Sequence, residues 1–281
     1  MSPRPEGPLR LCAHQELRIA LRSRWTQIFA LVFAVLALAV AATGYILSGG
    51  SGVQDFARTS VSLIQLVLLL VPLTSLLIGV LALAPERGAA ELLFSQPVSR
   101  RTILMGKLLG LFEALAGAQA LGFGAAGLVI FWQVGGAGLN GFILVILGSV
   151  LLTAIFLGIA ALIAAGAVGQ RRARALALAL VVWFGLVLLF DVAALGAASL
   201  LPSGLASRLL IVSVLINPAD AVRTAALLGI EGTSAFGAAS LAFLRFTHGA
   251  AGAAVLLGLS LLIWTLAPAW LAARRLSNSD I

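Results

Sequence analysis

The chain has 281 residues, of which 61% are hydrophobic and only 10% are charged. Soluble domains carry roughly a quarter charged residues, so this composition excludes an ordinary soluble protein. The formal net charge is +8, but the placement of the cations, described below, argues against nucleic acid as the partner.

Six apolar segments are each long enough to cross a bilayer as a helix, which takes about 20 residues. They are residues 26–48, 61–84, 107–132, 141–168, 174–200 and 250–271. Backbone groups inside lipid must bond to one another, and the sequence lacks the alternating ten-residue segments of membrane barrels. The predicted fold class is therefore an all-α integral membrane protein with six transmembrane helices.

Residues 8–25, before the first span, are expected to form a separate amphipathic helix. Arg10, His14, Arg18 and Arg22 recur every four residues and line one helical face. A basic helix with an apolar opposite face lies in the membrane plane. The first span begins too late for a cleavable signal peptide, so we expect it to remain in the mature chain.

The distribution of basic residues predicts the orientation of the chain. If the N-terminus is cytoplasmic, 14 of the 18 Lys and Arg residues fall on the cytoplasmic side of the six spans. The positive-inside rule selects this orientation over its reverse, with both termini in the cytoplasm. Topology and lipid contact are the simplest explanation of most of these cations.

A charged segment, residues 85–101, separates the second span from the third and is longer than a tight turn. We expect Pro97 to end a short amphipathic helix, Ser99 to cap the helix of the third span, and Arg100 to lie at the membrane surface. The apolar run 92–94 would be exposed unless it enters a partner's groove or rests on lipid. Docking to a cytoplasmic partner and a plain interfacial helix are both open interpretations.

Two ionisable residues lie inside the spans. Glu113 is about two turns past Lys107 in the third span, and Asp191 is in the outer third of the fifth. A carboxylate in lipid is costly and indicates function by default. For Asp191 the alternatives are pairing with a neighbouring helix, pairing with Arg223 or Arg208, contact with a substrate, and proton coupling.

The outer stretch 201–249 is too long to be a simple loop and is expected to contain short helices, some dipping into the membrane beside the sixth span. Asn217-Pro218-Ala219-Asp220 is a typical helix start, with Asn as the cap and Pro in the first turn. This local role can coexist with docking of a partner on the outer face.

The sequence lacks the motifs of several enzyme classes. It contains no phosphate-binding Gly-x-x-x-x-Gly-Lys-Ser/Thr loop and no His-Glu-x-x-His. Cys12 is the only cysteine, and Met and His are too few and too scattered for a metal pore. We therefore expect a non-enzymatic chain that binds no metal and no cofactor of its own.

In this order and spacing, the first helix, the six spans, the charged segment and the long outer stretch resemble the permease subunit of a type-two ABC transporter. The resemblance covers essentially the whole chain. It implies a cytoplasmic ATPase dimer, which binds ATP and Mg, and a second copy of the permease. The matching coupling-helix positions are Glu86, Arg87, Glu91, Leu92, Leu93, Phe94, Gln96, Pro97, Val98, Ser99 and Arg100.

A narrower resemblance rests on Trp183-Phe184, Phe190-Asp191 and the motif Asn217-Pro218-x-Asp220-x-x-Arg223. These residues are similar to those of permeases from the nitrous oxide reductase maturation system, which serves copper-site assembly. That resemblance implies a bacterial inner-membrane homodimer with a periplasmic beta-helical partner. The residues expected to face this partner are Asn217, Pro218, Asp220 and Arg223.

The predicted function is thus to couple ATP hydrolysis in a partner subunit to conformational change across the membrane. The scarcity of polar residues in the spans disfavours a wide hydrophilic pore. Two alternatives are an exporter permease for a lipid or small amphiphile, and a membrane scaffold or channel without an ATPase. An intramembrane enzyme is the least favoured alternative.

Overall fold

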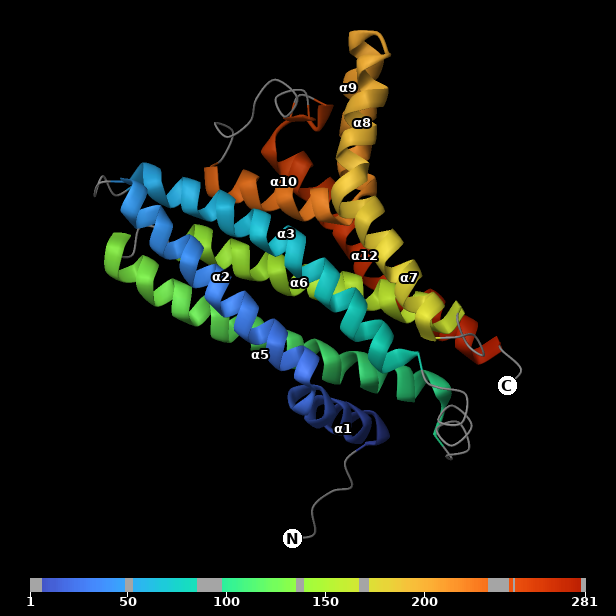
Figure 1. Cartoon of the computed structure of the whole chain (residues 1–281). Coiled ribbons are helices and arrows are strands. Elements are labelled where there is room, and N and C mark those ends of the chain that lie inside the picture. Colours follow the sequence, from blue (N-terminus) through green and yellow to red (C-terminus); the bar gives the residue numbers. More distant parts are fainter. Residues whose placement is uncertain are drawn as a thin grey trace.

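The computed structural model describes residues 7–48, 53–84, 98–134, 139–166, 172–231, 243–244 and 246–278. Within these residues the regular structure is helical and contains no strand. Figure 1 shows the elements: α1 (Pro8–Arg22), α2 (Arg24–Ser48), α3 (Val53–Leu83), α5 (Arg100–Val134), α6 (Leu139–Gly166), α7 (Arg172–Trp183), the π-helix η2 (Phe184–Leu189), α8 (Phe190–Ser199), α9 (Ser203–Ile216), α10 (Pro218–Glu231) and α12 (Ala250–Asn278).

Six of the described helical stretches are long and apolar enough to cross a membrane, which confirms the predicted fold class. They are Arg24–Thr43, Thr59–Leu83, Arg100–Trp132, Gly141–Gly166, Arg172–Ser199 and Ala250–Asn278. The third stretch begins at Arg100, seven residues before the predicted limit of 107. The sixth ends at Asn278, seven residues after the predicted limit of 271. Hydropathy marks only the lipid-buried part of a helix, whereas these two helices continue with their arginines outside it.

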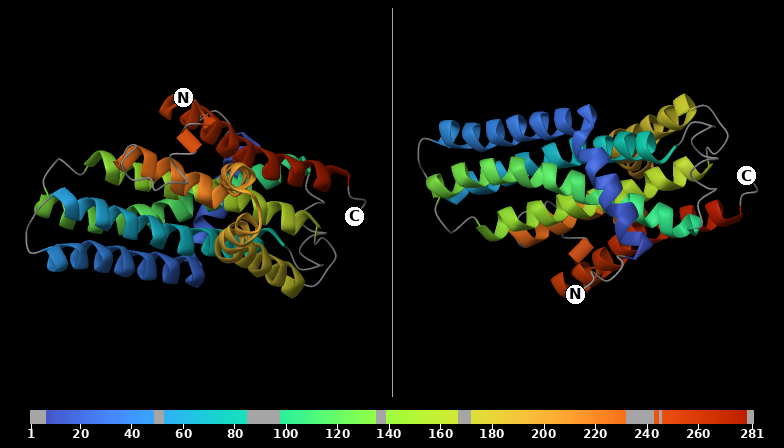
Figure 2. Two further views of the ribbon diagram at one scale, coloured as in Figure 1. Left: turned by 90° about the horizontal axis from the view of Figure 1, so that it is seen from above. Right: turned by 90° about the horizontal axis from the view of Figure 1, so that it is seen from below.

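The long helices lie side by side, so the ends of several spans meet. Figure 2 shows α2, α3, α5 and α6 running alongside one another, with α12 on the far side of α6 from α2. The Lys107 ammonium in α5 donates to the Ala82 carbonyl in the last turn of α3 (3.1 Å), and Arg172 of α7 donates to the neighbouring carbonyl of Leu81. We call this the α1 end of the bundle.

A row of phenylalanines joins three helices in the core. Phe33 of α2 contacts Phe123 of α5 edge-on, with ring centroids 5.1 Å apart, and Phe123 contacts Phe142 of α6 in the same way at 5.8 Å. Edge-to-face contacts of this kind stabilise by about 0.5–1.5 kcal/mol beyond area burial. They help to fix the relative rotation of these three helices.

Helix α1 crosses α5 closely where the sequence provides Gly106 and Gly110. A Cβ atom at Gly110 would collide with the carbonyl oxygen of Ala13, so only glycine permits this approach. Glu16 of α1 is buried and lies 3.4 Å from the Lys107 ammonium. The amphipathic helix expected over 8–25 is therefore present over Pro8–Arg22; its position in the membrane plane stays a prediction.

The outer part of the chain is a bent arm followed by a helix packed on the bundle. Helices α8 and α9 stand side by side and project from the other helices (Figure 1). Helix α10 then turns by 99° from α9 and packs against α6 and α12. The short helices expected in the stretch after residue 200 are present, and one of them contacts the fourth span as well as the sixth.

Candidate functional site

The bend between α9 and α10 is organised by Asn217. Its side-chain Oδ1 accepts a hydrogen bond from the Ala219 amide (3.1 Å), and its carbonyl accepts one from the Ala221 amide (2.9 Å). Pro218 occupies the first helical position and has no amide hydrogen to satisfy. The predicted helix start is confirmed, with Asn217 as its cap.

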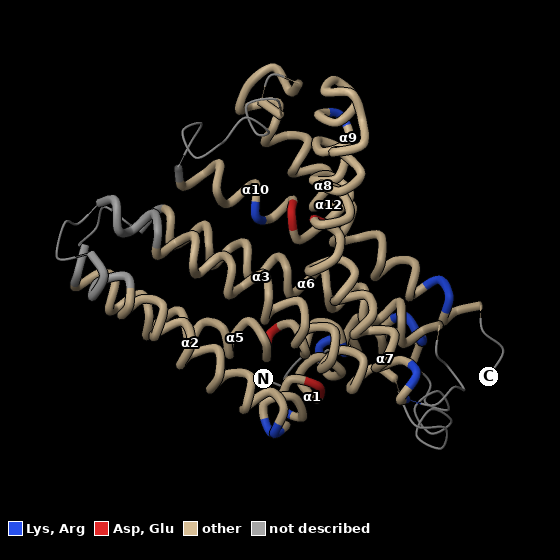
Figure 3. The backbone as a smooth tube through the Cα atoms, turned by 45° about the horizontal axis from the view of Figure 1, so that its top comes forward, with Lys and Arg blue, Asp and Glu red and all other residues tan. Residues whose placement is uncertain are grey.

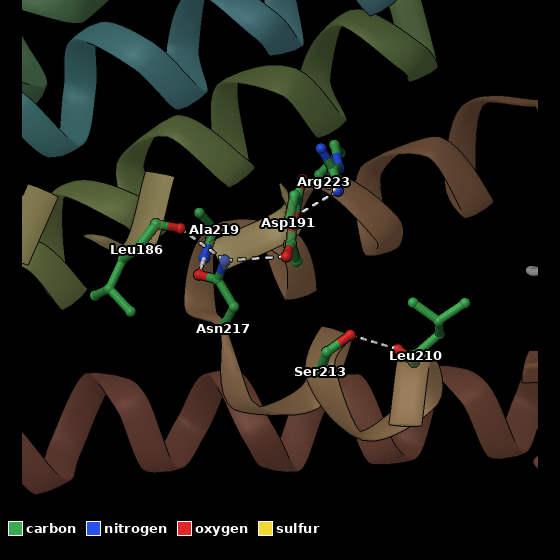
Figure 4. A network of polar contacts seen from close by, with 8 residues as sticks. Leu186, Asp191, Leu210, Ser213, Asn217, Ala219 and Arg223 are labelled. Carbon is green, nitrogen blue, oxygen red and sulfur yellow. Dashed lines mark hydrogen bonds and ion pairs between the residues drawn. The ribbon is translucent and has the colours of Figure 1, made fainter. Parts of the chain in front are cut away.

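The Asn217 amide nitrogen also ties this bend to the fifth span. It donates to the carbonyl of Leu186 (2.8 Å) and to Asp220 Oδ2 (3.0 Å). Leu186 lies inside η2, and π-helical turns displace carbonyls from the regular α-helical bonding pattern, frequently at functional sites. Figure 4 shows the Asn217 side chain close to the Leu186 carbonyl.

Two carboxylates share a single guanidinium beside this link. Arg223 Nη2 lies 2.6 Å from Asp220 Oδ1 and 2.9 Å from Asp191 Oδ2. Arg223 is therefore the partner of Asp191, one of the alternatives left open by the sequence. Figure 4 shows Arg223 and Asp191 pointing towards one another. With all three groups ionised, the cluster carries one negative charge in excess.

The depth of the cluster follows from helix geometry. Asp191 is 19 residues from the start of its span at Arg172, and a rise of 1.5 Å per residue places it roughly 28 Å along the helix. The hydrocarbon core is about 30 Å thick. The cluster therefore lies near the membrane boundary opposite the α1 end.

A small cavity opens next to the cluster. Its volume is about 180 Å³, and Asp191, Asp220 and Arg223 line it together with the hydroxyl-bearing Ser213 and Thr224. Several water molecules could fit in this space and bond to its charged groups and hydroxyls. Hydration there would stabilise the excess negative charge.

The four residues expected to face an outer partner differ in accessibility. Asn217 and Asp220 are buried, at 1% and 5% exposure, whereas the Arg223 side chain is 35% exposed. Pro218 is buried as well. The predicted partner-facing role is untested, and in this conformation only Arg223 offers its side chain to a partner.

Glu113, the other intramembrane carboxylate, lies apart from this cluster. It is exposed on the surface of α5, and among the described residues no ion pair or hydrogen bond of its side chain is found. Lipid is an unfavourable neighbour for such a group, so Glu113 must meet water, a headgroup or another chain. Its role stays a prediction.

Most of the predicted coupling segment, residues 85–97, lies outside the described residues; Val98, Ser99 and Arg100 lie within them. Ser99 Oγ accepts from the Thr102 amide (3.2 Å), so Ser99 caps α5 as predicted. Arg100 donates to the Leu276 carbonyl near the end of α12 (3.3 Å). This contact attaches the start of the third span to the end of the sixth, which no local pattern indicated.

The sequence analysis also missed a buried polar network between α5 and α6. Gln119 donates to Thr153 (2.6 Å) and accepts from Ser149 (2.7 Å), and all three side chains are at most 1% exposed. Searching the spans for ionisable residues alone overlooked these neutral groups. The i,i+4 spacing of Ser149 and Thr153 on one helical face was the available signal.

Within the described residues, no group of three or more His, Cys, Asp or Glu side chains could hold a metal ion. The two aspartates at the bend are already engaged by Arg223. The arrangement is suited to holding a bend in place and to presenting charge.

Comparison with known proteins decides the family. The sequence model of the ABC-2 family transporter proteins matches residues 11–281. The chain belongs to this family. It is 38% identical over 236 residues to "Probable ABC transporter permease protein NosY" of Stutzerimonas stutzeri and 36% identical to the protein of that name from Pseudomonas aeruginosa; each match covers 82% of this chain and 85% of the relative.

Family membership makes the chain a multi-pass permease component of an ABC transporter. Such a component is not normally the catalytic subunit, and it is expected to partner with an ATPase. The Arg100 contact and the bend at Asn217 lie at opposite ends of the bundle. These ends are the candidate functional sites.

Proposed function

We propose that this chain is the membrane subunit of an ABC transporter that serves nitrous oxide reductase maturation. The observation that carries the proposal is its similarity to two proteins named NosY over most of both chains, since NosY is the permease of that system. The motif of Asn217, Asp220 and Arg223, which suggested the same system from the sequence, forms one bonded unit with Asp191. The permease acts in copper-site assembly without carrying copper itself.

In this proposal the α1 end is cytoplasmic. Of the Lys and Arg residues whose side chains the structure describes, all but Arg208 and Arg223 gather at that end, as Figure 3 shows. The positive-inside rule then places both termini and the 85–101 segment in the cytoplasm of a bacterial inner membrane. A cytoplasmic ATPase dimer, which binds ATP and Mg, docks on that segment through the residues from Glu86 to Arg100.

A second copy of the chain completes the transporter. The fifth span has the smallest buried share of the six, 11% of its most apolar window. Its remaining apolar surface is left for lipid or for another permease. Pairing through this surface would bring two Asp191–Arg223 clusters into one assembly, facing a periplasmic beta-helical partner.

Helix α12 provides a route for motion between the two ends. Near its end it accepts the Arg100 bond at Leu276, and sixteen residues earlier Ser260 donates to the Leu215 carbonyl of α9 (2.6 Å). Those residues span about 24 Å of helix. Closure of the ATPases would move the start of α5, shift α12, and displace α9 beside the Asn217 bend.

Co-purification and complementation test this proposal. The tagged chain, expressed with the ATPase encoded beside it, should bring down that ATPase from mild detergent and raise its ATP hydrolysis. A strain lacking the permease should make nitrous oxide reductase deficient in copper, and the intact chain should restore it. Normal copper content without the permease would refute the maturation role, and failure to recover any ATPase would refute the coupling.

Ser260→Ala tests the α12 route within the intact complex. The variant should keep ATPase binding and lower reductase maturation, because it removes the contact with α9 and leaves the Arg100 end unchanged. Thr265→Ala is the matched control, since Thr265 bonds only within α12, to Leu261 (2.7 Å). Equal maturation by both variants would exclude this route.

An exporter permease for a lipid or small amphiphile is the second candidate, because the spans offer few polar residues to a hydrophilic cargo. Full copper loading of the reductase in the deletion strain, together with a changed lipid composition, would favour it.

A further inference from the structure

A second cavity lies at the α1 end, where α1, α2, α3, α5 and α7 meet. Its volume is about 450 Å³, within the range of roughly 300–1,000 Å³ typical of small-molecule sites. Polar residues in its lining are Glu16, Ser23, Thr26, Lys107 and Arg172, and apolar residues make up the rest. Neither the Asn217 bend nor the Arg100 contact involves this cavity.

The Thr26 hydroxyl in this lining is buried and unpaired. Thr26 is 3% exposed, and its Oγ1 has no hydrogen-bond partner among the described residues. Most buried polar side-chain atoms have a partner, and leaving one without any costs about 1–3 kcal/mol. A ligand in the cavity that accepts a hydrogen bond would remove this cost.

The charges around the cavity favour an anion. Lys107 and Arg172 contribute two positive charges, and Glu16, 3.4 Å from the Lys107 ammonium, contributes one negative charge. Trp25 and Thr26 belong to the first turn of α2, which begins at Arg24. The positive end of that helix dipole adds to the attraction. Among the lining residues that the structure describes, the net charge is +1, opposite in sign to a phosphodiester.

The rim of the cavity is apolar and open to the surroundings. Ile19 is 54% exposed and Trp25 is 63% exposed, and both line the cavity. Tryptophan is enriched at the level of lipid headgroups, and basic pockets between transmembrane helices bind such headgroups. A freely soluble phosphate would make no use of the apolar rim, whereas the acyl chains of a lipid would.

We propose that this cavity binds the headgroup of a membrane phospholipid. The phosphodiester faces Thr26, Lys107 and Arg172, and the acyl chains leave past Ile19 and Trp25. If the headgroup carries an amine, its ammonium group pairs with the Glu16 carboxylate in the same cavity. The bound lipid joins α1 to the starts of α2 and α7 and to the end of α3, so it stabilises the packing of α1.

The test uses the full-length chain in mild detergent, stripped of lipid by washing. Phosphatidylethanolamine, phosphatidylglycerol and inorganic phosphate are added separately, and binding is followed by native mass spectrometry and thermal unfolding. Wild type should bind one phospholipid per chain above the non-specific background. Thr26→Val and Arg172→Gln should each weaken this binding about tenfold, as expected when one hydrogen bond to a charged group is lost.

Matched controls separate the site from general effects of substitution. Thr265→Val removes a hydroxyl on α12, and Arg174→Gln removes an exposed cation two residues beyond Arg172. Both should bind lipid like wild type. Without lipid, Thr26→Val should melt no lower than wild type, because the substitution removes an unpaired buried hydroxyl. When lipid is added, its melting temperature should rise less than that of wild type.

Equal lipid binding by Thr26→Val, Arg172→Gln and their controls would overturn the proposal. The proposal would also be overturned if inorganic phosphate bound at this site and neither phospholipid displaced it. If Arg172→Gln fails to fold because it loses its contact with α3, the comparison of Thr26→Val with Thr265→Val decides alone.

Discussion

The shared guanidinium at the bend predicts that two substitutions, Arg223→Gln and Asp191→Asn, have unequal effects on stability. Arg223→Gln leaves Asp191 and Asp220 facing one another without their cation, whereas Asp191→Asn leaves one cation with one carboxylate. Removing one partner of a fully buried ion pair costs about 3–5 kcal/mol. The Asp220 side chain is only 6% exposed but that of Arg223 is 35% exposed, so we expect Arg223→Gln to cost about 2–3 kcal/mol.

The double variant gives the sharper result. Asp191→Asn alone should cost less than about 1 kcal/mol, and in the Arg223→Gln background it should restore stability, because it removes one of two opposed carboxylates. Thermal unfolding in detergent, followed by circular dichroism, gives the order of the variants. Arg208→Gln, an exposed arginine on α9, is the control and should melt like wild type.

Two outcomes would refute this reasoning. If Asp191→Asn destabilises as much as Arg223→Gln, the second carboxylate is required for the fold and is not in excess. If the double variant melts below Arg223→Gln, Asp191 has another partner. A stable Asp191→Asn variant that still binds the ATPase but fails in maturation would instead give Asp191 a direct role.

Three further predictions concern the coupling segment and the start of α5. Phe94→Asp should weaken ATPase recovery in a pull-down and leave membrane insertion normal; equal recovery would count against docking on this segment. Gly110→Leu should displace α1 and lower the melting temperature. Gly117→Ala is the control and should leave the melting temperature unchanged, because a Cβ atom there points into open space. Similar melting temperatures for both variants would show that α1 is not held by close packing. Ser99→Ala should cost about 1 kcal/mol through loss of the α5 cap, measured as a lower melting temperature, and an unchanged one would show that the cap contributes nothing.

The sequence predicted the spans well because lipid leaves the backbone few options. A segment of 20 or more apolar residues in a membrane has to be helical, so length and hydropathy suffice to find all six. The cap at Asn217 was predictable for a similar reason, since Asn followed by Pro is a purely local signal. The sequence suggested several possible partners of Asp191 but could not decide among them. Arg223 lies 32 residues away in the chain, and only the fold brings the two side chains together.

The π-helix and the polar network show where local patterns end. Residues 184–189 are all apolar or glycine, and nothing in that run distinguishes a π-helix from an α-helix. The bond from Asn217 to Leu186 joins residues from different elements, so it depends on how the outer arm folds back. The Gln119 network also depends on the packing of two spans, with no charge to draw attention to it.

The same amide links three features that a local reading treats separately. The Asn217 side chain caps α10, donates to a carbonyl of η2 and donates to Asp220, which in turn binds Arg223. Between helices in lipid there is little hydrophobic force, so hydrogen bonds and close packing set relative positions. A displacement of α9 therefore cannot leave η2 unchanged unless the Asn217 bond breaks. If α9 is displaced as proposed, the fifth span should therefore move with it, and the partly exposed Arg223 side chain would present that movement at the surface.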